Sequence, residues 1–111
     1  MALEDFFRTY TTDNLGQIFL TGNLNVEAYR KVNFMLITDS GINMTVNCEM
    51  GTYSGGGGGG TLAQSVAQFA LEFLQPQIHT FDVLGPEFRI VLFNGPPNTD
   101  VPLQGWLLLQ T

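Results

Sequence analysis

Charged residues are scarce in this chain of 111 residues, at 13% of the sequence, whereas they make up about 25% of a typical soluble domain. The formal net charge is −6, and the only cations are Arg8, Arg30, Lys31 and Arg89. Four scattered cations cannot form the basic surface that neutralises phosphates, so the composition argues against binding of nucleic acid or of anionic membranes. Solubility must then rest on Asn, Gln, Thr and Ser, or a partner must cover part of the surface.

Cysteine and histidine each occur once, which restricts the chemistry open to the chain. Cys48 has no second cysteine for an intrachain disulfide, and its apolar neighbours at period two, Val46 and Met50, indicate a buried thiol. One histidine and one cysteine are too few for a zinc site, and no nucleophile, base and orienting group can be assembled around His79. We therefore expect no catalytic residue, no metal and no cofactor, and a structural role for His79.

Long hydrophobic runs are also missing. No stretch approaches the roughly 18 consecutive apolar residues of a membrane-spanning helix. The first ten residues carry Glu4 and Asp5 where a secretory signal would have basic residues. The sequence therefore predicts a protein that is kept in the cytoplasm or becomes part of a released particle, with no signal peptide and no membrane partner.

The clearest positive signal is the alternation of apolar and polar residues. The length fits a single domain spanning 1–111. Residues 42–50 alternate strictly, which indicates a half-buried strand, and before them Val32, Phe34 and Leu36 alternate with Asn33, Met35 and Ile37. The Asp-Ser-Gly segment between them predicts a hairpin turn with Gly41 in the left-handed conformation. In this register Phe34 and Val46 are cross-strand neighbours on the buried face.

A second hairpin is predicted over residues 77–93. Its turn would be Gly85-Pro86, with a positive φ at the glycine. The register pairs Asp82 with Arg89 as an exposed ion pair and places His79 on the apolar face.

Three further segments complete the predicted sheets. Residues 18–21 and 103–110 read as shorter strands, and the leucines at 107–109 indicate a strand that is covered on both sides or by a partner. Residues 61–75 fit either a helical stripe that ends at Pro76 or an alternating strand, and the surrounding strands favour the strand. Together the elements predict an all-β fold, an antiparallel β-sandwich that forms a jelly roll of seven to eight strands.

Six consecutive glycines occupy residues 55–60. They form either a flexible loop or a packed segment that another backbone can approach closely. The Tyr53 ring beside them is suited to contact with a sugar or a subunit, whereas Trp106, among leucines, is expected in the core. The candidate ligand or subunit contacts, which include two residues of the loop before the last strand, are Tyr53, Gly57, Gly58, Asn98 and Asp100.

The C-terminal sequence TFDVLGPEFRIVLFNGPPNTDVPLQGWLLLQ combines a strand, a Gly-Pro turn, a strand, a long loop and a final apolar strand. In this arrangement it resembles the closing strands of galactose-binding-like and discoidin-like jelly-roll domains. The resemblance implies a β-sandwich that binds carbohydrate, although Cys48 has no partner for the disulfide usual in that family.

The predicted function follows from low charge, apolar strands and the glycine run, all of which fit covered surfaces. We expect a non-enzymatic structural or interaction module that self-associates as a homo-oligomer or forms part of a larger assembly. The alternative is a carbohydrate-binding, lectin-like or adhesin-like module with a glycan ligand. A small hydrolase is disfavoured for lack of a catalytic set.

Overall fold

The computed structural model describes residues 2–21, 24–51 and 64–111, and for residues 2–8 it describes the backbone alone. The regular secondary structure in these ranges consists of β-strands alone. In chain order they are β1 (Ala2–Thr11), β2 (Ile18–Phe19), β3 (Leu24–Asn25), β4 (Lys31–Thr38), β5 (Met44–Gly51), β6 (Gln64–Leu71), β7 (Gln77–Asp82), β8 (Glu87–Phe93) and β9 (Asp100–Gln110).

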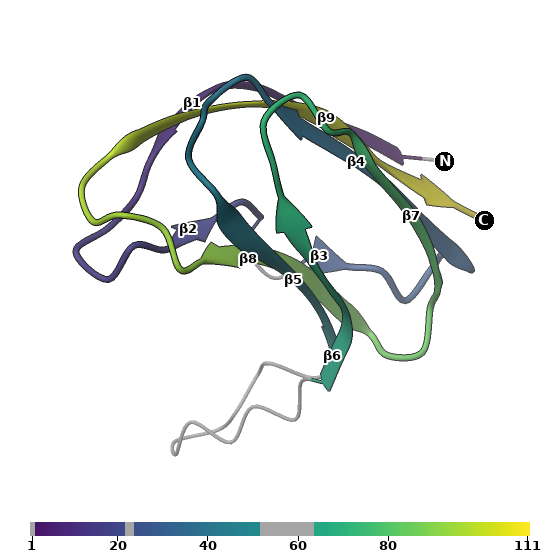
Figure 1. Cartoon of the computed structure of the whole chain (residues 1–111). Helices are drawn as coiled ribbons and strands as arrows, with labels where there is room; N and C mark the ends of the chain where they lie inside the picture. The colour runs from purple at the N-terminus through teal and green to yellow at the C-terminus, as the bar shows by residue number, and fades with distance from the viewer. Residues whose placement is uncertain (1, 22–23, 52–63) are drawn as a thin grey trace, which may run out of the picture.

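The strands form two antiparallel sheets packed face to face (Figure 1). Sheet A has the order β1-β9-β4-β7, and sheet B has the order β2-β8-β5-β6, with β3 also pairing with β8. If β2 and β3 are counted as one interrupted strand, this order is that of an eight-stranded jelly roll. The predicted antiparallel β-sandwich is therefore confirmed.

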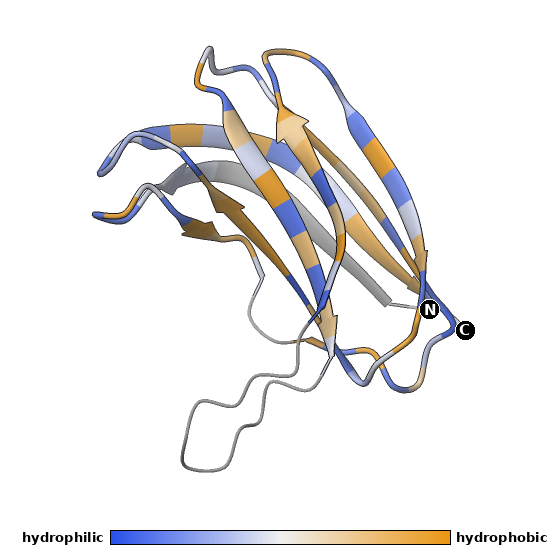
Figure 2. Cartoon of the chain, turned by 60° about the horizontal axis from the view of Figure 1, so that its bottom comes forward, coloured by the Kyte–Doolittle hydropathy of each residue, from blue (hydrophilic) through white to orange (hydrophobic). Residues whose placement is uncertain are grey.

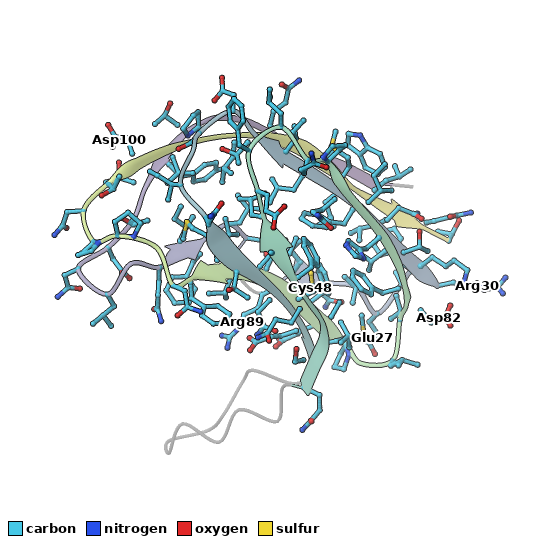
Figure 3. The ribbon with its side chains drawn as sticks, viewed as in Figure 1. Glu27, Arg30, Cys48, Asp82, Arg89 and Asp100 are labelled. Carbon is cyan, nitrogen blue, oxygen red and sulfur yellow. The ribbon has the colours of Figure 1, made fainter. Side chains whose placement is uncertain are left out.

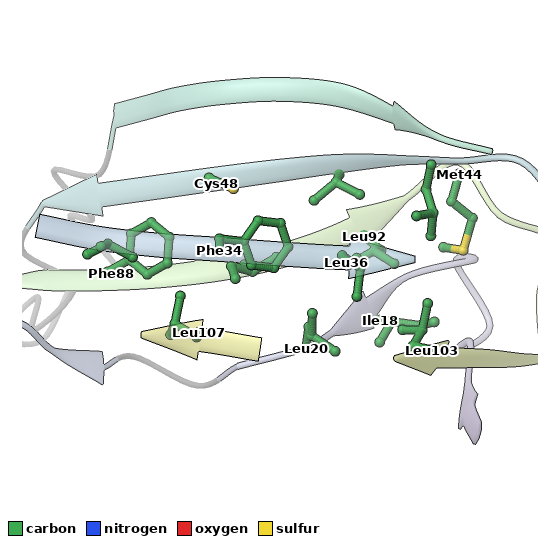
Figure 4. Close-up of a cluster of buried hydrophobic side chains, with 14 of the residues drawn as sticks. Ile18, Leu20, Phe34, Leu36, Met44, Cys48, Phe88, Leu92, Leu103 and Leu107 are labelled. Carbon is green, nitrogen blue, oxygen red and sulfur yellow. The ribbon is translucent and has the colours of Figure 1, made fainter. Parts of the chain in front are cut away.

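The core lies between the sheets, where buried side chains of both sheets meet (Figure 4). Hydrophobic and hydrophilic residues alternate along the strands in Figure 2. Phe34 and Leu36 from β4 meet Val46 and Cys48 from β5, and none of these four side chains is exposed. The apolar faces predicted for these two strands are the faces that the fold buries.

The predicted hairpin over residues 32–50 is wrong. Strand β4 pairs with β7 and β9, whereas β5 pairs with β6 and β8, so the chain crosses from sheet A to sheet B between them. Phe34 and Val46 are both buried, but they come from opposite sheets and are not cross-strand neighbours. Gly41 does not take the predicted positive φ, because the segment forms a crossover rather than a tight turn.

The predicted hairpin over residues 77–93 is wrong for the same reason, since β7 belongs to sheet A and β8 to sheet B. Asp82 does not pair with Arg89. It accepts a hydrogen bond from Lys31 at 2.6 Å, whereas Arg89 pairs with Glu49. Gly85 also lacks a positive φ.

The structure has strands in all three of the remaining predicted segments. Strands β2 and β9 fall on residues 18–21 and 103–110, although β9 begins earlier, at Asp100. Residues 64–71 form strand β6, which confirms the strand reading of that segment. Residues 61–63 lie outside the described ranges.

The connections between strands lie at the two ends of the sandwich. One end of sheet A is marked by the pairing of Thr11 with Asp100, and the other by the pairing of Lys31 with Asp82. We call the first the acidic end. It comprises the connections 12–17, 39–43, 72–76 and 94–99, and together with the first residue of β9 its charged residues are Asp13, Asp39, Glu72 and Asp100. The connections 26–30 and 83–86 lie at the opposite end. Figure 3 shows Asp100 and Arg30 on opposite sides of the molecule.

Candidate interaction surfaces

The outer face of sheet B is polar along β5. Its outward residues there are Thr45, Asn47 and Glu49. The Asn47 amide donates to Glu49 at 2.9 Å, the Ser65 hydroxyl donates to Asn47 at 2.6 Å, and the Arg89 guanidinium donates to Glu49. A smaller apolar strip lies at the margin of the face, where Phe19 pairs with Val91. The centre of this face is a hydrogen-bonded network suited to water.

The outer face of sheet A is apolar at its centre. Met35 of β4 lies between Ile78 of β7 and Trp106 of β9, which are its cross-strand partners. Ile37 and Leu108 extend the row along β4 and β9. Ile78 is 67% exposed, and the other four are half-buried. We call these five residues outer face A. A contiguous apolar surface of this kind is typical of a surface that a partner covers.

Trp106 lies on outer face A, so its predicted place in the core is wrong. Alternation along β9 buries Val101, Leu103 and Leu107 and directs the tryptophan outward. The same alternation turns Leu108 outward, where it is half-buried. The leucine run is thus buried on one face and partly covered on the other.

A hollow of about 250 Å³ opens where outer face A meets the acidic end. Its apolar walls are Ile37, Leu74, Pro102 and Leu103, and its polar groups are Thr9, Thr38, Asp39 and Gln104. The Thr38 hydroxyl is already used, because it donates to the Pro102 carbonyl at 2.7 Å and accepts from the Ser40 N–H at 3.1 Å. Asp39 is the one charged residue of the lining. The hollow therefore suits an apolar side chain with a cation beside it.

One wall of the hollow holds an unusual backbone conformation. Leu74 has a φ of 53°, in the left-handed region that residues with large side chains seldom adopt. Its N–H donates to the Thr38 carbonyl at 2.8 Å, which fixes the β6–β7 connection against the end of β4. The Leu74 side chain nevertheless remains 54% exposed. Local strain that presents an apolar group to solvent is a pattern found at functional positions.

His79 lies among phenylalanine rings between the edge strands β6 and β7. Its ring centroid is 4.1 Å from that of Phe69 and 6.1 Å from that of Phe81, and the rings are nearly parallel. Nε2 lies 3.4 Å from the Gln77 side-chain oxygen. Partial burial lowers the pKa of His79. The predicted placement on the apolar face is confirmed, and the structural role stays a prediction.

Cys48 is fully buried, as predicted. Burial, and to a lesser extent the charge of Glu49, raises the pKa of its thiol to about 12. A thiol in this state is protonated at neutral pH and is a poor nucleophile. In the described ranges, no three His, Cys, Asp or Glu side chains converge as metal ligands, and no helix is long and apolar enough to cross a membrane.

The residues named from the sequence do not form this hollow. Tyr53, Gly57 and Gly58 lie outside the described residues. Asn98 donates its N–H to the Asp13 carbonyl at 3.0 Å, and Asp100 accepts from a threonine hydroxyl at the end of β1. Asn98 thus ties two connections of the acidic end together, Asp100 joins the start of β9 to the end of β1, and both residues lie outside the hollow's lining. Sequence reasoning missed the hollow because its lining comes from four separate segments.

Known structures share the fold of this chain, but no family is identified for it. No family model matches the chain, and no curated protein matches it significantly. Among solved structures, a chain described under "Bacillus endospore appendages form a novel family of disulfide-linked pili" is 14% identical, with a TM-score of 0.61, covering 99% of this chain and 87% of that one. The crystal structure of PirA is 11% identical, with a TM-score of 0.50 and coverage of 96% and 95%.

A third structure, of infectious bursal disease virus Gx strain, has a TM-score of 0.46 at 14% identity and covers 96% of this chain and 29% of that one. At these identities the first two likenesses establish the β-sandwich fold alone, and the third carries no argument. None of the three is described as a galactose-binding-like or discoidin-like domain, so that resemblance stays a prediction.

Proposed function

We propose that this chain is a non-enzymatic structural module that self-associates or forms a repeated part of a larger assembly. The observation that carries the proposal is the contrast between the two outer faces. The centre of sheet B is a polar network around Asn47 and Glu49, whereas sheet A presents Met35, Ile78 and Trp106 side by side. Removing apolar surface from water is favourable, so a second copy gains by covering outer face A.

The sheet edges support the same proposal. Strands β6 and β7 form adjacent edges of the two sheets. The sequence of β6 has no charged residue, and that of β7 has Asp82 alone besides His79. Edge strands that stay solvent-exposed usually carry lysines, prolines or inward-pointing charges that prevent pairing. These edges are therefore suited to cover by another subunit.

The fold likeness is compatible with an assembling subunit, because the first neighbour is described as forming pili. That neighbour's pili are described as disulfide-linked. The single cysteine of this chain is buried and its thiol has a raised pKa. We therefore infer that any assembly of this chain uses non-covalent contacts.

The surroundings of His79 support a role without catalysis. In the described part of the chain, its ring packs on Phe69 and Phe81, and its one hydrogen-bond neighbour is Gln77. An acid–base histidine needs a reacting group within hydrogen-bond reach and a partner that orients it. Glycan binding and a location in the cytoplasm or in a released particle stay predictions.

Sedimentation equilibrium at micromolar concentration tests the proposal. We expect a weight-average mass above the 12.2 kDa of the single chain. Met35→Lys should lower that mass, because it places a charge at the centre of outer face A. Thr45→Lys is the matched control, since it places the same charge on the polar outer face of sheet B. A wild-type protein that stays monomeric throughout would refute the proposal.

A further inference from the structure

We propose that copies of this chain join head to tail, with Leu84 of one copy seated in the hollow at the acidic end of the next. The inference rests on the proposed function and adds to outer face A a second contact, between the two ends of the molecule. Leu84 is 81% exposed, the largest value among the large hydrophobic side chains of the described residues. It stands on the connection 83–86, at the end opposite the hollow.

The backbone around Leu84 is anchored to both sheets. The Val83 N–H donates to the Arg30 carbonyl at 2.9 Å, and the Leu84 N–H approaches the Met50 sulfur at 3.0 Å. Gly85 lies so close to the end of β5 that an added Cβ would be 3.1 Å from Gly51. A projecting side chain on an anchored connection loses little conformational entropy on docking.

The hollow matches a leucine side chain in size and chemistry. Its volume is about 250 Å³, and an apolar cavity of about 150 Å³ already takes a benzene molecule. Ile37, Leu74 and Pro102 supply apolar walls. Leu84 of one copy therefore leaves water and gains apolar contacts in the hollow of the next copy.

The charges beside the two features are complementary. Asp39 lies in the lining of the hollow. Arg30, whose carbonyl holds the connection of Leu84, is exposed. The pKa of Asp82 is lowered by Lys31 and, to a lesser extent, by the positive charge of Arg30. Lys31 is engaged with Asp82 at 2.6 Å. Glu27 and Glu87 are also at this end, so the attraction is local, between Arg30 of one copy and Asp39 of the next.

The placement of the two features fixes the symmetry of the contact. The leucine and the hollow are different surfaces at opposite ends, so the contact is heterologous. Each copy offers one of each, and repetition of such a contact gives an open filament unless the rotation closes a ring.

Two single variants test the two halves of the contact. Leu84→Asp replaces the projecting side chain, and Leu74→Asn removes an apolar wall with a residue that tolerates the left-handed conformation. We expect both proteins to assemble less than the wild type by sedimentation equilibrium, with a melting temperature no lower than that of the wild type in dilute solution, where all three are monomeric. Leu15→Asp is the matched control, because Leu15 is 72% exposed but lies outside the hollow, and it should assemble as the wild type does.

Mixing the two variants tests the head-to-tail geometry. Leu84→Asp keeps its hollow and Leu74→Asn keeps its leucine. When both also carry Met35→Lys, which removes contact at outer face A, an equimolar mixture should form dimers and nothing larger. Arg30→Asp and Asp39→Arg should each lower the weight-average mass, because each places two like charges at the contact. The double variant should regain the mass, because it restores opposite charges.

The outcomes separate this inference from the proposed function. If the wild type assembles and Leu84→Asp retains the full mass, the head-to-tail contact is wrong and the proposed function stands. If the mixture forms long assemblies, the heterologous geometry is wrong. If the wild type is monomeric, both fail.

Discussion

Phe34 shows at the scale of one residue how the core is held. It is fully buried, and its ring centroid lies 6.1 Å from that of Phe69. Phe34→Ala should reduce the free energy of unfolding by about 3–5 kcal/mol, because it removes apolar contact and leaves a cavity. Chemical denaturation should show a lower midpoint with an unchanged m-value. A loss below about 1 kcal/mol would contradict the assigned core.

His79 makes stability depend on pH. Burial lowers its pKa in the folded state below the ordinary value of 6.5, so the unfolded chain takes up the proton first as the pH falls. The contribution of the neutral ring to the free energy of unfolding is complete above pH 6.5. It is lost as the pH falls from there toward the folded-state pKa. His79→Phe keeps the ring stack and should remove this part of the acid dependence, measured as denaturation midpoints at neutral pH and at about pH 5. An identical pH dependence in both proteins would show that His79 is not its source.

Strand β9 depends on one close approach to its neighbour. A Cβ at Gly105 would lie 2.0 Å from the Met35 carbonyl oxygen of β4. Gly105→Ala should therefore force the two strands apart and destabilise the fold by more than about 2 kcal/mol. Gly41→Ala is the control, because a Cβ there meets nothing within 4 Å. Equal melting temperatures for the two variants would contradict the packing of sheet A.

The order of the elements shows what could be predicted from the sequence. Alternation in β4 and β5 identified the buried faces, because a period of two depends only on the strand itself. It could not identify the partner strand. The five residues 39–43 can close a hairpin or cross between sheets, and here they cross. The observed ion pairs, Lys31–Asp82 and Glu49–Arg89, join strands that are far apart in the sequence.

The site was harder to predict than the fold. Asn98 lies in the predicted connection and joins it to the 12–17 connection, whereas Asp100 is the first residue of β9 and bonds to the end of β1. The hollow needs tertiary structure to exist, since β1, β4, β9 and the 72–76 connection each supply part of its lining. The left-handed conformation of Leu74 has no local signal, because leucine is not a residue that favours it.

At the scale of the whole molecule, the two ends of the sandwich differ in a way that favours polymerisation. The acidic end has an apolar hollow with Asp39, and the opposite end has the projecting Leu84 with Arg30 beside its connection. Subunits joined this way add independently to either end of a growing chain. The apolar outer face A remains available for contact between such chains.

The weight-average mass as a function of concentration tests this account most directly. Sedimentation equilibrium over a wide concentration range should show a mass that starts near 12.2 kDa in dilute solution and rises continuously, without a plateau. Salt should shift the curve to higher concentration, because it screens the attraction between Arg30 and Asp39. A mass that levels off at twice the single-chain value, or that never rises, would contradict head-to-tail assembly.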